Sequence, residues 1–362
     1  VYACSIYGGS VSAILINVPG TPQSAATVID GYPMAQQGNA ALALGWATVG
    51  SFIGGMFSLV LLVLTAPQLA KFSLKFGPIE TFALIFFALT TIAWVSKGSM
   101  VKGVLASLIG LFLGIVGPDL MTGQTRFDFD ILVLSGGFEL VPVLIGIFAL
   151  SEVLIQGAFL KDASAPTVIE GGFKLAPWNE WRIRWMTFLR SSVIGSFIGI
   201  LPGTGATAAA FIAYADAKRR SPRSAKFGHG EPEGVVASET ANNAVSGGAM
   251  IPMLALGIPG DGVTAIMMGA LTIHGIIPGV RLFSDQPSLV TSIFLLLFLA
   301  NILILIVGAC GAGLYARLLK APMSLLKPAI VFLCFVGAYA TRTIPVDFYL
   351  LIISGIAGFL LR

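Results

Sequence analysis

Long uncharged apolar runs recur along this chain and restrict what it can fold into. The runs contain no Lys, Arg, Asp or Glu, and they cover residues 31–70, 81–96, 103–118 and 286–316. Several reach or approach the roughly 20 residues that a helix needs to cross the hydrocarbon core of a bilayer. Because the apolar residues are continuous and do not alternate with polar ones, a transmembrane β-barrel is disfavoured. The sequence therefore predicts an all-α fold, a polytopic helical membrane protein.

The few charged residues are placed unevenly. They make up 10% of the chain, whereas soluble domains carry about 25%. Ten of the 21 basic residues fall between Lys161 and Lys226, and the positive-inside rule assigns such a cluster to the cytoplasm. Asp30 is the only charge in the first 70 residues; an intramembrane functional role and a turn or helix-cap role both stay open for it. We expect no nucleic-acid binding from so apolar a chain.

Three Pro-Gly pairs interrupt apolar segments. They stand in INVPGTP (16–22), in GILPGTGATAAAFIAYADAKRRS (199–221) and in LGIPGDG (256–262). A Pro-Gly pair ends helical hydrogen bonding, and each backbone group left free would cost several kcal/mol against lipid. Such breaks persist where protein, water, an ion or a substrate satisfies the free groups. The half-helix that follows a break presents an N-terminus that favours anions, so we expect broken helices that bind a substrate or an ion.

The middle break lies between basic flanks. Arg190 and Lys218 bracket it, and no basic residue lies between them. A continuous helix would place these flanks on opposite sides of the membrane, which the positive-inside rule disfavours. We therefore expect a re-entrant helical hairpin that folds back at residues 202–205 and keeps both flanks in the cytoplasm. A kinked but continuous span is the alternative.

The first half of the chain resembles the second. YGGSVSAILINVPGTPQSA (7–25) is similar to SGGAMIPMLALGIPGDGVTA (246–265). After each copy we expect a long helix and then two short spans; the long helices cover about 39–65 and 287–316, and the short spans about 78–96, 102–118, 324–341 and 345–361. Four matching pieces in one order predict an internal duplication. Duplicated halves with broken helices are typical of secondary transporters.

The duplication divides the chain into three predicted parts. Residues 1–130 form a first transport repeat, 131–190 a connecting span and cytoplasmic loop, and 191–362 a second transport repeat. Since the chain opens and closes inside apolar segments, we expect the first repeat to be truncated at its N-terminal end and the second at its C-terminal end. Whether the repeats are inverted in the membrane stays open at this point.

Residue types that carry enzyme chemistry are sparse. Cys4, Cys310 and Cys334 have no disulfide or metal-site spacing and are interpreted as small buried apolar residues. His229 and His274 are 45 residues apart and belong to no metal-binding motif. The chain also contains no HExxH or GxSxG motif. We expect no enzyme activity, no cofactor and no metal centre, apart from a coupling Na⁺ at the breaks.

Four longer motifs together carry a family resemblance. They are YGGSVSAILINVPGTPQSAATVIDGYPMAQQG, GPDLMTGQTRFDFD, GILPGTGATAAAFIAYADAKRRS and EGVVASETANNAVSGGAMIPMLALGIPG. These motifs resemble the large membrane subunit of the tripartite tricarboxylate transporters, the TctA type, over essentially all 362 residues.

The resemblance implies a multi-pass permease subunit that imports carboxylates across the bacterial inner membrane. It implies coupling to a Na⁺ or H⁺ gradient rather than to ATP. It also implies two partners, a small membrane subunit of the TctB type and a periplasmic solute-binding protein of the TctC type. A passive anion channel, or a carrier without a binding-protein partner, is the alternative.

The candidate substrate and ion site lies at the breaks. Small hydroxyl and amide side chains there suit both Na⁺ and carboxylate oxygens, although helix packing by small residues is the simpler explanation for any single Ser or Thr. The motif ETANNAVSGG (239–248) favours function because it places two amides and a carboxylate in front of a broken helix. The full set of candidates is Ser10, Asn17, Pro19, Gly20, Pro202, Gly203, Thr204, Gly205, Thr207, Glu239, Asn242, Asn243, Pro259 and Gly260.

Overall fold

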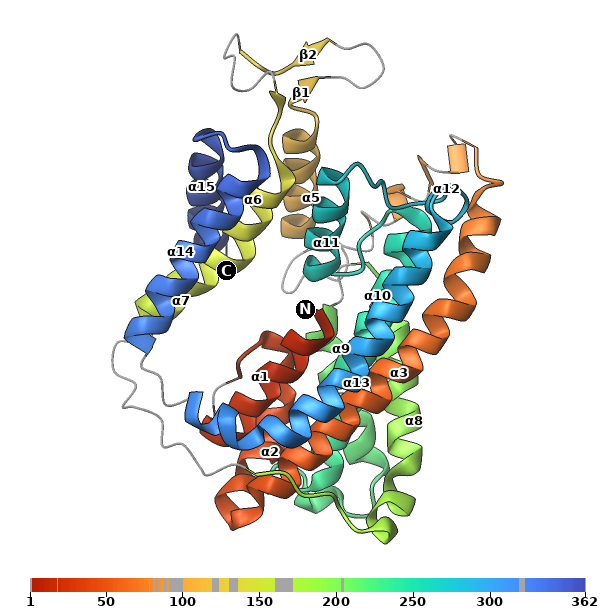
Figure 1. Cartoon of the computed structure of the whole chain (residues 1–362), viewed down its shortest axis with the longest axis vertical. Coiled ribbons are helices and arrows are strands. Elements are labelled where there is room, and N and C mark those ends of the chain that lie inside the picture. The colour runs from red at the N-terminus through yellow and green to blue at the C-terminus, as the bar shows by residue number, and fades with distance from the viewer. Residues whose placement is uncertain are drawn as a thin grey trace. The chain divides into compact units, whose positions relative to one another are not determined.

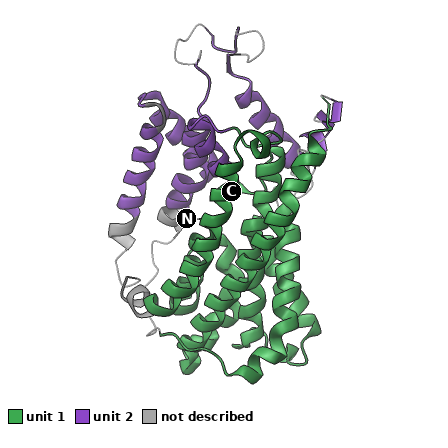
Figure 2. Ribbon diagram, turned by 45° about the vertical axis from the view of Figure 1, so that its right-hand side comes forward, with its two compact units in different colours: residues 1–77, 164–264, 277–321 green, residues 78–163, 265–276, 322–362 purple. Residues whose placement is uncertain are grey.

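The structure is a computed structural model. It describes residues 2–17, 19–77, 79–80, 82–83, 85–87, 90, 100–118, 124–129, 136–159, 172–202, 205–318 and 323–361. Apart from one pair of short strands, the regular structure within these ranges is helical, which confirms the all-α prediction. The contacts divide the chain into two compact units, which Figure 2 colours separately.

The first unit comprises residues 1–77, 164–264 and 277–321. It contains two short helical turns, the 3-10 turns η1 (Pro22–Ser24) and η5 (Ser224–Lys226), and one π-helical turn, η2 (Ala35–Asn39). Its α-helices are α1 (Tyr2–Ile16), α2 (Ala25–Met34), α3 (Ala40–Ser73), α8 (Trp178–Ile200), α9 (Gly205–Arg220), α10 (Pro232–Leu256), α12 (Leu282–Asp285) and α13 (Pro287–Leu318).

Helix α10 is the buried centre of this unit (Figure 1). Every residue from Glu233 to Ala255 is buried, because α1, α2, α3, α8 and α9 all pack against it. Small residues permit this packing. A Cβ on Gly54 of α3 would collide with the Thr240 carbonyl oxygen, and a Cβ on Gly195 of α8 would collide with the Ala241 carbonyl oxygen. Close backbone approach at small residues is how membrane helices associate. The polar side chains of α10 are consequently cut off from solvent.

Two described helical segments are long and apolar enough to cross a membrane by length and composition, namely Pro22–Ser73 and Pro287–Gly311. The first runs from η1 into α3 through the π-helical turn η2, where Gly38 has a φ of 81°. The two predicted long helices are confirmed as α3 and α13. Helix α3 continues through Pro67 and ends at Ser73, beyond the predicted end.

The second unit comprises residues 78–163, 265–276 and 322–362. Strand β1 pairs with β2 in antiparallel fashion, with Gly117 opposite Arg126. The π-helical turn η4 packs against α15, where a Cβ on Gly146 would collide with Ser354. The elements of this unit are α5 (Met100–Gly114), β1 (Gly117–Pro118), β2 (Thr125–Arg126), α6 (Leu140–Leu144), η4 (Ile145–Leu150), α7 (Ser151–Phe159), most of α11 (Gly262–Ile273), α14 (Met323–Arg342) and α15 (Val346–Leu360).

Three of the four predicted short spans correspond to helices of this unit. The span expected at about 102–118 is α5, and those at about 324–341 and 345–361 are α14 and α15. The span expected at about 78–96 lies largely outside the described residues.

The cysteines agree only in part with their interpretation as buried apolar residues. All three are free, as expected, and Cys334 is buried. Cys4 and Cys310 are exposed, so the prediction of burial is wrong for them. Both belong to apolar helices that present a face to the surroundings of the protein, and an apolar sequence context does not distinguish such a face from a core face.

Candidate functional site

The middle break is a helical hairpin. The Arg190 Nε atom on α8 lies 3.9 Å from the Asp216 Oδ2 atom on α9. In one continuous helix these residues would be about 39 Å apart along the axis at 1.5 Å per residue. The chain therefore folds back between Ile200 and Gly205, and Gly205 adopts a φ of 68° that favours glycine. The predicted fold-back is confirmed and the kinked continuous span is wrong, while the cytoplasmic location of both flanks stays a prediction.

At the first break the chain returns along the helix it has just left. Asn17 ends α1 with a φ of 58°, and the Gly20 N–H donates to the Gly9 carbonyl at 3.2 Å. A Cβ on Gly20 would lie 2.9 Å from the Gly9 Cα atom, so the return requires glycine. The next helical turn begins with a capping box, in which the Thr21 side chain accepts the Ser24 N–H and the Thr21 N–H donates to Ser24 Oγ at 3.3 Å.

The third break has the same local geometry. Gly257 caps α10 in the left-handed conformation, with a φ of 70°. The chain then returns so closely that a Cβ on Gly260 would lie 2.7 Å from the Ala249 Cα atom. Asp261 and Thr264 exchange capping hydrogen bonds of 2.9 Å at the start of α11. In both breaks the glycine of the Pro-Gly pair therefore packs against the residue eleven positions before it, Gly9 for Gly20 and Ala249 for Gly260. A pair of capping residues follows each of these glycines.

The three breaks lie close together around α10. A Cβ on Gly260 would come within 2.6 Å of the Gly199 carbonyl oxygen, so the third break packs against the end of α8 beside the hairpin turn. Turn η1, directly after the first break, packs against α9 and α10. The Tyr2 hydroxyl of α1 donates to the Asp261 carboxylate. The second and third breaks are thus in direct contact, and the segment that follows the first break packs against α9 and α10 in the same unit.

A buried carboxylate lies near the first break. Glu239 is 0% exposed and accepts hydrogen bonds from Thr27 of α2 and, at 3.1 Å, from Ser51 of α3. The Ser10 hydroxyl of α1 also bonds to it. Asn243 extends the cluster, because its Nδ2 donates to Ser51 Oγ at 2.8 Å and to the Glu239 carbonyl at 3.2 Å. Within the described part of the chain, no basic side chain pairs with the Glu239 carboxylate.

Asn242 is buried beside this cluster with neither amide atom bonded. It is 0% exposed, and among the described residues neither its Oδ1 nor its Nδ2 has a hydrogen-bond partner. At about 100° per residue, Asn242 lies about 60° around α10 from Glu239 and about 20° from Ala249. Ala249 is the residue that Gly260 packs against. Asn242 therefore stands between the Glu239 cluster and the third break, and a buried amide without partners marks a place for a polar ligand.

Comparison with known proteins identifies the family. The model of the Tripartite tricarboxylate transporter TctA family matches residues 1–362, the whole chain. The chain belongs to the TctA family. It is therefore a membrane component of a tricarboxylate transporter, which agrees with the prediction of a transporter rather than an enzyme.

Two relatives of the chain come from Agrobacterium vitis. One is an uncharacterized 52.8 kDa protein in the TAR-I ttuC' 3'region, and it is 40% identical over 367 residues, covering all of this chain and 72% of the relative. The other is an uncharacterized protein in the TAR-II ttuC' 3'region, 40% identical over 167 residues, covering 46% of this chain and 69% of the relative. No solved structure matches the chain.

In this TctA protein the residues predicted as a site come together in part. Ser10, Glu239 and Asn243 share one hydrogen-bonded cluster, and Asn242 lies next to it. Gly203 and Thr204 lie outside the described residues. The remaining candidates form the breaks themselves: Asn17, Pro19 and Gly20 are exposed, Gly205, Thr207 and Pro259 are half-buried, and Pro202 and Gly260 are buried.

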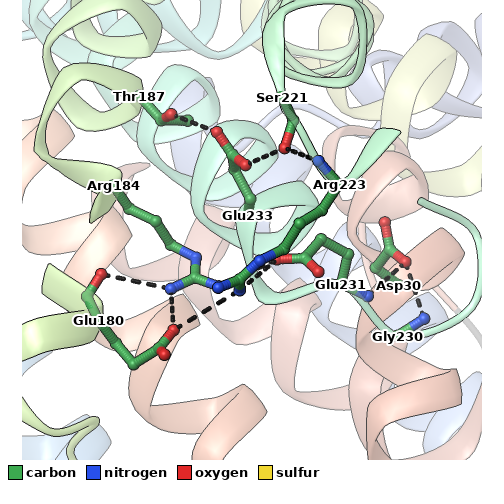
Figure 3. A network of polar contacts seen from close by, with 9 residues as sticks. All are labelled: Asp30, Glu180, Arg184, Thr187, Ser221, Arg223, Gly230, Glu231 and Glu233. Atoms are coloured by element: carbon green, nitrogen blue, oxygen red, sulfur yellow. Dashed lines mark hydrogen bonds and ion pairs between the residues drawn. The ribbon is translucent and has the colours of Figure 1, made fainter. Parts of the chain in front are cut away.

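Asp30 has a structural role in the TctA fold. Its carboxylate is fully buried, and its Oδ1 accepts the backbone N–H groups of Gly228, Gly230 and Glu231 at 2.8, 2.9 and 2.9 Å. Its Oδ2 accepts the Tyr214 hydroxyl at 2.8 Å. Figure 3 shows this carboxylate directed at the loop that precedes α10. Of the two readings left open by the sequence, the geometry supports the loop role.

A buried ionic network adjoins this loop and was missed by the sequence reasoning (Figure 3). Arg184, 1% exposed, pairs with Glu231 at 3.0 Å and with Glu180 one helical turn away. Arg223 approaches the same two carboxylates at 3.8 and 3.9 Å. The sequence signal was present, because Arg184 stands between aromatic residues of an amphipathic segment, but the basic cluster was interpreted only as cytoplasmic loop. The network joins α8 to the start of α10.

Proposed function

We propose that the chain is the permease subunit of a secondary-active carboxylate importer, coupled to a Na⁺ or H⁺ gradient. It spans the bacterial inner membrane several times, receives substrate from a periplasmic solute-binding protein of the TctC type and works with a small subunit of the TctB type. The observation that carries the proposal is the unpartnered, fully buried amide of Asn242, three residues from Glu239 on α10, the helix that the broken segments pack against.

The polar groups of this region suit an anion that arrives with a cation. The Asn242 amide offers donors to a carboxylate oxygen. Turn η1, which leads into α2, and helices α9 and α11 begin directly after the breaks, and a helix N-terminus carries a partial positive charge. No Lys or Arg is supplied by the broken segments at residues 7–25 and 239–265, so a co-bound cation is the natural source of a full positive charge.

The matching breaks support the proposal of two transport repeats. The capping pairs Thr21–Ser24 and Asp261–Thr264 are separated by 240 positions, and so are Gly20 and Gly260. This offset agrees with the one that aligns the two sequence motifs. Broken helices at corresponding positions of two halves are where secondary transporters bind their substrate. We assign residues 1–130 and 191–362 to the two repeats on this ground.

Uptake into vesicles tests the function. Inner-membrane vesicles or proteoliposomes containing this chain, its small subunit and its binding protein are given a labelled tricarboxylate under an imposed Na⁺ or H⁺ gradient. We expect accumulation above the external concentration that stops when the gradient is collapsed. Downhill flux that ignores both gradients would establish the passive anion channel instead. Uptake that is equal with and without the binding protein would establish a carrier without that partner.

A further inference from the structure

We infer that the cluster around Glu239 is the binding site of the coupling cation, that this cation is Na⁺, and that Asn242 belongs to a separate, adjacent site for the substrate carboxylate. This inference rests on the proposed cation-coupled transport and assigns the two ligands to different residues of the same region.

The Glu239 carboxylate lacks a compensating charge. It is 0% exposed, and its hydrogen-bond partners among the described residues are hydroxyl groups alone, those of Ser10, Thr27 and Ser51. Burying an ionised carboxylate is costly unless a positive charge or a proton accompanies it. Asp30, which is also 0% exposed, has three backbone N–H donors and a tyrosine hydroxyl. Glu239 therefore needs an additional ligand in a way that Asp30 does not.

The atoms around Glu239 are the ligands that a hard cation takes. Each hydroxyl oxygen has lone pairs left after donating its proton, and hard cations are bound by carboxylate, carbonyl and hydroxyl oxygens. Asn243 supplies a further observation, because its Nδ2 donates to Ser51 Oγ at 2.8 Å while its Oδ1, fully buried, accepts no hydrogen bond from the described residues. An unpaired carbonyl oxygen beside an uncompensated carboxylate fits a metal cation better than it fits a proton.

The position of the cluster explains how the cation would control substrate binding. Its ligands come from α1 and α2, which flank the first break, from α3, and from α10, which precedes the third break. Asn242 lies about 60° around α10 from Glu239. With the cation site empty, the Glu239 charge repels an anion at Asn242; with Na⁺ bound, the repulsion is removed. The two ligands therefore raise each other's affinity, as any coupling between sites requires.

The test measures Na⁺ binding apart from transport. The purified chain in detergent is titrated with NaCl at constant ionic strength, balanced with choline chloride, and its Tm and bound ²²Na⁺ are recorded. We expect saturable Na⁺ binding that raises the Tm, and loss of both signals in Glu239→Gln. Ser51→Ala removes one ligand and is expected to weaken Na⁺ binding by about tenfold.

Ser58→Ala is the matched control on the same helix. Ser58 is fully buried like Ser51, but its hydroxyl donates to the Gly55 carbonyl at 3.0 Å within α3. We expect Na⁺ affinity to be unchanged in this variant. Equal losses in Ser51→Ala and Ser58→Ala, or wild-type Na⁺ affinity in a folded Glu239→Gln protein, would overturn the inference. Uptake driven by H⁺ without any Na⁺ binding to the wild type would also overturn it.

The outcome for the proposed function is read separately. Gradient-driven uptake by the wild-type complex in proteoliposomes is measured independently of Na⁺ binding by the variants. If the wild-type complex shows such uptake and Glu239→Gln binds Na⁺ normally, the cation site is wrong while the transport function stands. If the wild-type complex shows only downhill flux, cation-coupled transport fails, and with it the coupling role assigned to Glu239.

Discussion

Gly260 packs against the Gly199 carbonyl oxygen so closely that a Cβ on Gly260 would come within 2.6 Å of that oxygen. The return of the third break and the end of α8 are thereby in direct contact, although 61 positions separate these two residues in the sequence. This contact is the physical link between two of the three Pro-Gly breaks, and it depends on the absence of a side chain.

Because the chain packs so closely on α1 after the first break, alanine substitutions at the neighbouring residues Gly8 and Gly9 should have different effects. Gly9→Ala would place a Cβ against Thr21, whereas Gly8→Ala would meet nothing within 4 Å. Overpacking a tight contact costs about 1–3 kcal/mol, so we expect Gly9→Ala to lower the Tm and to reduce uptake while Gly8→Ala keeps both. Gly260→Ala should behave like Gly9→Ala. Thermal unfolding in detergent measures the first quantity; unchanged Tm in all three variants would contradict the geometry.

Asn242→Ala is expected to impair transport much more than folding. The Asn242 amide makes no hydrogen bond within the described residues, so its loss leaves no partner unsatisfied in the empty protein. A site built to hydrogen-bond a ligand loses that interaction when the amide is removed, and we expect uptake to fall by about tenfold or more. Asn243→Ala removes two hydrogen bonds and should lower both uptake and Tm. Wild-type uptake in a folded Asn242→Ala, Asn243→Ala double variant would refute both roles.

Asp30→Ala should destabilise the first unit strongly. Three backbone N–H groups and the Tyr214 hydroxyl lose their acceptor, and each unsatisfied buried donor costs about 1–3 kcal/mol. Tyr214→Phe removes a single bond to the same carboxylate and serves as the graded comparison, with an expected loss of about 1 kcal/mol. Limited proteolysis near residues 221–231 reports whether the loop is released. An Asp30→Ala protein that unfolds like the wild type would show that the clamp is dispensable.

Arg184→Ala is expected to cost about 3–5 kcal/mol, because it leaves the buried Glu231 carboxylate without its nearest cation. Glu231→Gln in the same protein should restore part of that loss, which a double-mutant cycle measures as a coupling energy. Arg219→Ala is the control, since the Arg219 side chain is 75% exposed and a surface ion pair contributes about 0–1 kcal/mol. Additive effects of the two changes at 184 and 231 would contradict the pairing.

The hairpin predicts the side from which its two flanks are reached. In a variant with Cys4, Cys310 and Cys334 replaced by serine, single cysteines at Arg190 and Lys218 should react with a membrane-impermeant maleimide from the same side of the membrane. The positive-inside rule makes that side the cytoplasm. Labelling of the two positions from opposite sides would contradict the close approach of Arg190 and Asp216.

The sequence was sufficient to predict most of the helices, but only some of the contacts between them. Charge placement on either side of Pro202 was enough to predict the hairpin, since the positive-inside rule constrains where Arg190 and Lys218 lie. The extent of α3 was underestimated, because the predicted helix ended at about residue 65 and α3 continues through Pro67 to Ser73. Asp30 could not be assigned from sequence, because its partners are backbone N–H groups of a loop about 200 residues away. The same long separation hides the pairing of Glu239 with Thr27 and Ser51.

The clamp at Asp30 has a mechanical consequence. It ties α2 to the loop in front of α10, and the Arg184 network ties the same loop to α8. Thr27 and Glu239, one on α2 and one on α10, are therefore joined through contacts outside their own cluster as well as within it. We expect α2, α8 and α10 to move together during transport, and the opening and closing that carry a substrate through to be performed by other segments.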